Sequence, residues 1–122
     1  MRMWMVPTEY LCRKHLLGEH VEHHMFVGTL KRKLQLDGYV RNNLVEIKRL
    51  EERHDTLVAE MLRRGMNHNS PLQEHDISYL PERVQNATVD VQASIDDLIG
   101  RCEECRARYE AINADRAEHA EA

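Results

Sequence analysis

Apolar side chains recur every three or four positions along most of this chain, which is the spacing of an α-helix that buries one face. Three stretches show it, residues 9–36, 43–64 and 81–112. No segment alternates apolar and polar residues as a half-buried strand does. The pattern predicts an all-α fold, a compact single domain of three main helices.

Breaker residues separate the predicted helices. Asp37-Gly38 ends the first one, and Gly65 stands where a residue of left-handed conformation commonly closes a helix. Residues 66–80 carry turn-forming side chains without a helical period, so we expect an ordered loop there. The last residues are rich in Ala, Glu and His, which predicts a domain of residues 1–114 followed by an acidic, frayed tail over residues 115–122.

The composition is typical of one small cytoplasmic domain. A chain of 122 residues is long enough for one core. Charged residues make up 31 %, and no apolar run approaches the ~18 residues of a membrane span. No secretory signal pattern opens the chain, and the three cysteines, an odd number, argue against a disulfide framework. We therefore expect a cytoplasmic protein that does not contact a membrane.

The net charge of −4 argues against a nucleic-acid partner, but the charges are unevenly distributed. Residues 1–67 hold twelve basic and nine acidic side chains, an excess of +3. Residues 68–122 hold five basic and twelve acidic ones, a balance of −7. The first part of the chain can therefore face phosphates while the second faces away, and we expect modest, salt-sensitive DNA affinity.

Three polar side chains share a face of the first predicted helix with its apolar stripe. At ~100° per residue, His15, Glu19 and Glu22 fall beside Leu16 and Phe26. Carboxylates next to a buried stripe are costly unless they have partners. Two interpretations are open: they lie at the margin of the stripe, solvated or paired with arginines, or they line a pocket where this helix meets the N-terminal segment.

Histidines and cysteines raise the question of a metal. His20 and His24 are one helical turn apart, as metal ligands often are, and Cys102 and Cys105 form a single C-x-x-C. No second cluster in the sequence clearly supplies the remaining ligands, so surface histidines and half-buried thiols are the simpler interpretation. We expect no bound metal.

Three stretches carry a resemblance to a known family. They are KHLLGEHVE at Lys14–Glu22, LVAEMLRRGMN at Leu57–Asn67, and HDISYLP at His75–Pro81, the last followed at similar spacing by residues 93–95. Together, in this order, they resemble the phage-type pyrimidine-dimer DNA glycosylases with abasic-site lyase activity, the family of phage endonuclease V. The resemblance runs from the N-terminus to about residue 105.

The resemblance implies an all-α enzyme that excises the 5′ base of a pyrimidine dimer and then nicks the abasic site. The family's nucleophile is the α-amine of the mature N-terminal residue, which falls on Met1, and its key carboxylate falls on Glu22. Methionine is normally retained before a residue as large as Arg2, which is consistent with this register. An α-amine is a suitable nucleophile because α-amines ionise near ~7.7–8.0, far below a lysine. His15, Glu19 and Glu22 face this amine if the segment from Met1 to Trp4 packs across the first predicted helix.

The resemblance also implies DNA contacts. Arg2 matches a family arginine beside the N-terminus, and His15 matches a histidine that contacts the DNA. Arg101 matches an arginine that binds phosphate, and Lys14 is the first residue of the first similar stretch. Val21, Met25 and Cys105 stand where the family has basic residues, and the family's aromatic C-terminal tail is missing. Abasic-site cleavage is therefore better supported than dimer specificity.

The leading hypothesis is a DNA repair glycosylase and abasic-site lyase that uses Met1 and Glu22 and needs no metal or other cofactor. Its partner is double-stranded DNA with a damaged pyrimidine or an abasic site, and it acts as a monomer, in the host cytoplasm if a phage encodes it. The second hypothesis is a non-catalytic DNA-binding or host-interaction module on the same fold. The third is a metal-dependent hydrolase built on the histidines of the first helix.

Overall fold

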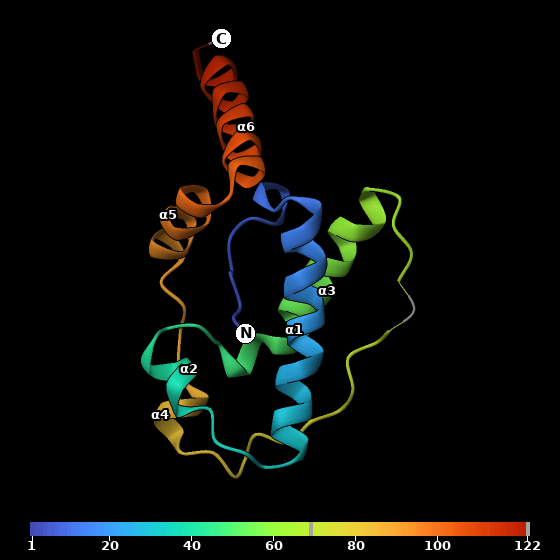
Figure 1. Cartoon of the computed structure of the whole chain (residues 1–122), viewed down its shortest axis with the longest axis vertical. Helices are drawn as coiled ribbons and strands as arrows, with labels where there is room; N and C mark the ends of the chain where they lie inside the picture. Colours follow the sequence, from blue (N-terminus) through green and yellow to red (C-terminus); the bar gives the residue numbers. More distant parts are fainter. Residues whose placement is uncertain (69, 122) are drawn as a thin grey trace.

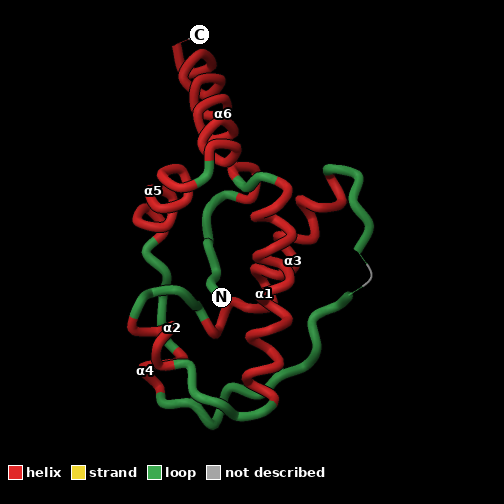
Figure 2. Tube along the Cα trace, viewed as in Figure 1, coloured by secondary structure: helices red, strands yellow, loops and turns green. Residues whose placement is uncertain are grey.

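The computed structural model describes residues 1–68 and 70–121, and within them every regular element is helical (Figure 2). This confirms the predicted all-α domain. The helices of this part of the chain are α1 (Arg13–Lys31), α2 (Asp37–Arg41), α3 (Leu50–Arg63), α4 (Glu82–Gln85), α5 (Val91–Arg101) and α6 (Glu103–Glu121), with 3-10 turns at Thr8–Tyr10 and Ile47–Arg49.

The N-terminal segment lies between α1 and α5, with α3 packed on α1 (Figure 1). Met3 and Trp4 are both buried, and because successive side chains of an extended segment point to opposite sides, they enter different parts of the core. Trp4 packs with Leu16, Leu57 and other side chains of α1, α3 and α5. Met3 packs with Phe26 and the residues around the Ile47–Arg49 turn. The predicted packing of this segment across the first helix is therefore confirmed.

The predicted helix boundaries were less accurate. The first helix ends at Lys31, because Lys33 adopts a left-handed conformation with φ 54°, and Asp37, predicted to end it, begins α2. The second begins at Leu50, not at residue 43, since Asn43 also has a positive φ of 57°. Apolar side chains keep the helical spacing across these positions, but the backbone leaves the helical conformation there.

The third predicted helix is three helices. α4 ends at Gln85, and Asp90 starts α5 by accepting a hydrogen bond from the Ala93 amide at 3.1 Å. Cys102 then adopts an extended conformation, φ −127° and ψ 112°, and turns the chain into α6. The break at Cys102 positions both cysteines of the C-x-x-C.

α6 projects from the rest of the fold, and its C-terminal end is far from the N-terminal segment (Figure 1). Its backbone is helical to Glu121, so it runs past residue 114, where the domain was predicted to end, and through residues 115–121 of the predicted tail; residue 122 lies outside the described residues. Among the described residues, no helix is both long enough and apolar enough to cross a membrane.

Candidate functional site

A surface cavity of about 430 Å³ lies where the N-terminal segment meets α1 and the end of α5. All six residues predicted from the sequence to act in catalysis or DNA binding line it. The lining residues are Met1, Arg2, Trp4, Lys14, His15, Gly18, Glu19, Glu22 and Arg101. The structure therefore brings the predicted set together, from positions up to 100 residues apart in the sequence.

Glu22 lies next to the start of the chain. Its Oε2 accepts a hydrogen bond from the backbone amide of Arg2 at 3.1 Å. One residue further on, the Met3 amide donates to the Leu44 carbonyl at 2.7 Å, and the Met3 side chain is fully buried. The hydrogen bonds of the Arg2 and Met3 amides, with the buried Met3 side chain, hold the backbone that follows Met1 in place beside the Glu22 carboxylate.

The Arg2 side chain is a structural anchor in this arrangement. Its Nη1 donates to Asp97 at 2.6 Å and its Nη2 donates to the Ser94 hydroxyl at 3.2 Å, both on α5. The guanidinium also stacks over the Trp4 ring at 3.7 Å, and Ser94 in turn donates to the Trp4 carbonyl at 2.6 Å. Asp97 was not singled out from the sequence, and Ser94 appeared there only within the similar stretch at residues 93–95, because nothing local marks either as a partner of Arg2, more than 90 positions away. Contact of Arg2 with DNA stays a prediction.

Glu19 has a different role from Glu22. Arg53 of α3 holds it with two hydrogen bonds, 2.7 and 2.9 Å long, and both side chains are buried. A third bond from Arg53 goes to the carbonyl of Val6 at 2.8 Å. For Glu19 the arginine-paired interpretation is therefore confirmed, and Glu22 is the carboxylate whose surroundings fit the pocket interpretation.

Two exposed cationic side chains line the cavity. Lys14 and Arg101 are exposed, and Arg101 also pairs with Asp97 at 2.8 Å. Burial, together with the charges of Lys14 and Arg101, lowers the pKa of His15. His15 is therefore neutral at pH 7 and acts as a hydrogen-bonding group instead of a third cation.

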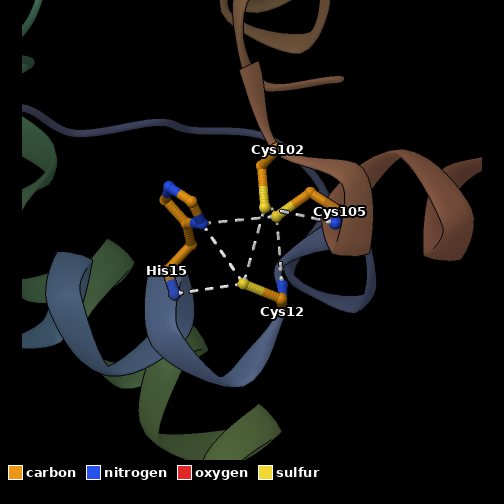
Figure 3. A group of neighbouring side chains, drawn as sticks. All are labelled: Cys12, His15, Cys102 and Cys105. Carbon is orange, nitrogen blue, oxygen red and sulfur yellow. Dashed lines mark hydrogen bonds between the residues drawn. The ribbon is translucent and has the colours of Figure 1, made fainter. Parts of the chain in front are cut away.

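His15 also belongs to a second group of side chains, shown in Figure 3. Its Nδ1 and the sulfurs of Cys12, Cys102 and Cys105 all lie within 4.8 Å of one another. Cys12 caps the start of α1, and the other two cysteines flank the start of α6. Burial raises the pKa of the Cys105 thiol to about 12, so this sulfur is a neutral thiol unless a cation lies beside it. Cys12 was not predicted as a ligand, although its C-x-x-H spacing with His15 is visible in the sequence.

Histidines gather at a third place, between α1, α3 and the loop after α3. One ring nitrogen from each of His20, His54 and His68 lies within 4.8 Å of the others, and His24 packs against the rings of His20 and His54. Burial and the neighbouring imidazoles, His54 first, lower the pKa of His20 to about 4. His20 is therefore neutral at pH 7. His20 and His54 are buried and His24 and His68 are half-buried, so His20 and His24 are not the surface residues that the simpler interpretation expected.

The fold and the cavity together define a class of protein: a small all-α domain whose N-terminal segment and helix-borne glutamate form one site. The family model of pyrimidine dimer DNA glycosylase matches residues 1–74, more than half of the chain, and this chain belongs to that family. The matched range contains Met1 and Glu22, while Arg101 lies outside it. No curated protein and no solved structure matches the chain.

Proposed function

We propose that this protein is a DNA repair glycosylase with abasic-site lyase activity, in which the Met1 α-amine is the nucleophile and Glu22 is the acid, base and electrostatic group. One observation carries the proposal: both residues line one cavity, and the Arg2 amide, adjacent to Met1, donates to Glu22 at 3.1 Å. Membership of the pyrimidine dimer DNA glycosylase family supports the substrate class.

The first step replaces the base. The lone pair of the neutral amine forms a bond to C1′ of the sugar, and the C1′–N1 bond breaks, with its electron pair leaving on the base. Positive charge develops on the sugar before the new bond is complete. The Glu22 carboxylate stabilises that charge because a fixed anion in a partly enclosed site is already oriented toward it.

The second step cuts the strand. The new ammonium first loses a proton to a base such as Glu22; its nitrogen lone pair then expels O4′, which takes up a proton, and leaves a protonated Schiff base at C1′. This group acidifies the 2′ carbon, so a carboxylate can remove a 2′ proton while the C3′–O3′ bond breaks and the 3′ phosphate departs. Water then hydrolyses the imine and regenerates the Met1 amine.

The surroundings of the cavity fit a nucleotide that has left the duplex. An amine in a cavity cannot reach C1′ inside stacked DNA, so the damaged nucleotide has to be extruded. In this proposal the exposed Lys14 and Arg101 bind phosphates next to it, and His15 offers a neutral hydrogen bond. Val21 and Met25, both exposed on α1, offer no charge to a lesion, which favours abasic sites over dimers as the better substrate.

Borohydride trapping tests the proposal, because borohydride reduces a Schiff base to a stable amine. Incubation with a duplex that carries one abasic site should give a covalent protein–DNA adduct and, without borohydride, a nicked strand. DNA binding without an adduct or a nick would instead support the non-catalytic module. Strand cleavage that a chelator abolishes, without any trapped adduct, would support the metal-dependent hydrolase.

A further inference from the structure

We propose that this protein holds a structural zinc ion on Cys12, His15, Cys102 and Cys105, at the point where the start of α1 meets the start of α6 (Figure 3). The ion would not take part in the chemistry proposed above. The inference stands on the geometry of these four side chains and does not depend on the glycosylase reaction.

The distances fit a tetrahedral ion. With Zn–S bonds of about 2.3 Å and Zn–N bonds of about 2.0–2.1 Å, the edges of the tetrahedron are about 3.8 Å between two sulfurs and about 3.6 Å between sulfur and nitrogen. The Sγ atoms of Cys12 and Cys102 are 3.9 Å apart. The Nδ1 of His15 is 3.2 Å from the sulfur of Cys12 and 3.5 Å from that of Cys105. Three cysteines and one histidine form a closed structural set of zinc ligands.

The backbone around the sulfurs is arranged for thiolates. The Cys12 amide donates to the Cys105 sulfur at 3.2 Å, and the His15 amide donates to the Cys12 sulfur at 3.5 Å. The Cys105 amide donates to the Cys102 sulfur, also at 3.5 Å. The ligand pairs C-x-x-H and C-x-x-C each begin a long helix, α1 and α6, where backbone dipoles favour negative charge. Such donors neutralise part of the charge of bound thiolates and orient them.

A disulfide explains less of this arrangement. The Cys12 and Cys102 sulfurs are 3.9 Å apart, well beyond a disulfide bond, and all three cysteines are free thiols. A disulfide would also involve neither the third thiol nor the His15 Nδ1. An ion uses all four groups, and it accounts for the extended backbone at Cys102, which separates α5 from α6 and turns the sulfur toward α1.

A separate observation carries a second zinc site, on His20, His54 and His68 with His24 beside them. The Nε2 atoms of all four rings are buried and have no hydrogen-bond partner among the described residues. Buried polar atoms are normally paired, so four orphaned nitrogens in one place need an explanation.

The tautomers of two rings point to that explanation. His54 Nδ1 lies 3.1 Å from the Asp55 carboxylate, and the backbone of Ser70 accepts from His24. A ring that donates through Nδ1 leaves a lone pair on Nε2, which is the form that binds a metal, and a carboxylate behind the ring is the usual support of such a ligand. Imidazoles from α1, α3 and the following loop therefore converge with unpartnered Nε2 atoms, a donor set that suits zinc.

Metal analysis of the intact protein tests both sites. The whole chain is produced with zinc sulfate in the medium, passed through a chelating resin that removes loosely bound metal, and analysed by elemental mass spectrometry. The expected content is two zinc ions per chain. Cys102→Ser should reduce it to one, His54→Gln should reduce it to one, and the combined variant should retain none. His75→Gln, a histidine outside both clusters, should retain two.

Each alternative result has a meaning. Two ions in Cys102→Ser, or a Cys12–Cys102 disulfide in the native protein with no metal, would overturn the first site. Two ions in His54→Gln would overturn the second, and wild-type protein without zinc would overturn both.

X-ray absorption at the zinc edge covers the case in which a variant does not fold. On wild-type protein the average shell should contain both sulfur and nitrogen, and on His54→Gln it should become three sulfurs and one nitrogen. A wild-type shell without sulfur would overturn the first site. A wild-type average of three sulfurs and one nitrogen per zinc would overturn the second.

Discussion

Glu19 and Glu22 are less than one turn apart on α1, yet their surroundings give them different roles. Two hydrogen bonds from buried Arg53 occupy Glu19, whereas Glu22 lines the cavity and is bonded to the Arg2 amide. The sequence predicted the face that both residues share from the helical period alone. It did not predict which one the arginine would take, because Arg53 lies on another helix, 34 residues away.

Substitution of Glu22 by glutamine should separate binding from chemistry. We expect the β-elimination rate on abasic-site DNA to fall roughly 10²–10⁴-fold, since glutamine can accept the Arg2 hydrogen bond but cannot remove a proton. Affinity for the same duplex should not fall. The measurement is single-turnover nicking, with Glu110→Gln on exposed α6 as the matched control. Nicking at the wild-type rate would remove Glu22 from the mechanism.

The Glu19–Arg53 pair should behave as a buried ion pair. Glu19→Gln leaves a buried guanidinium without its counter-charge, and we expect the free energy of unfolding in urea to fall by about 3–5 kcal/mol. The double variant Glu19→Leu, Arg53→Met should lose less than that, since it removes both charges. The lost bond to the Val6 carbonyl accounts for about 1 kcal/mol of its cost. A double variant less stable than Glu19→Gln would contradict this account.

At the scale of elements, α5 acts as a clamp on the N-terminal segment. Asp97 and Ser94 hold the Arg2 guanidinium, and Ser94 also bonds the Trp4 carbonyl. The helical nature of this region was predictable from its apolar spacing. The breaks between the predicted helices were not predictable. Lys33, Asn43 and Cys102 leave the helical conformation under tertiary constraints, which the spacing of apolar residues does not show.

Loss of the clamp should slow the reaction more than it weakens the fold. Asp97→Asn removes the negative partner of Arg2, and we expect about 1 kcal/mol less stability, because Asp97 is partly exposed. The Met1 amine is then less well placed beside Glu22, so Schiff-base formation should slow several-fold. The rate is measured by timed borohydride trapping, with Asp96→Asn on the same helix as control. An unchanged trapping rate in Asp97→Asn would restrict the clamp to a structural role.

At the scale of the whole molecule, part of the negative charge lies on a helix that leads away from the cavity. Many acidic residues lie on α6, which projects away from the rest of the fold (Figure 1). Met1, Lys14 and Glu22 lie in the part of the chain with net charge +3, and Arg101 is the one predicted site residue from the acidic part. The total of −4 therefore describes DNA binding less well than the charges around the cavity do.

The salt dependence of DNA binding should report these charges. Lys14→Ala should reduce the slope of log affinity against log salt concentration by about 1, since one phosphate contact is lost. Lys31→Ala, at the other end of α1 and outside the cavity, should leave the slope unchanged. Both slopes are measured by fluorescence anisotropy on the same abasic-site duplex. Equal slopes for the wild type and Lys14→Ala would show that Lys14 does not touch the backbone.

The parts of the site differ in how far the sequence reveals them. Met1 and Glu22 were predicted because they match the family at single positions, and both line the cavity; their roles in the reaction stay predictions. The Cys12–His15 and Cys102–Cys105 pairs are 90 residues apart, and each is unremarkable alone. Only the packing of α6 against the start of α1 brings them together, so the sequence could indicate two possible ligand pairs but not that they form one four-ligand site.

Mapping the trapped adduct tests the central claim most directly, because Lys14 offers a second amine in the same cavity. After borohydride reduction on abasic-site DNA and digestion of both components, mass spectrometry locates the residue that carries the sugar remnant. The account predicts the remnant on the Met1 nitrogen, and no adduct once that nitrogen is acetylated, while Lys14→Gln still forms it. A remnant on Lys14, or an adduct that persists on the acetylated protein, would contradict it.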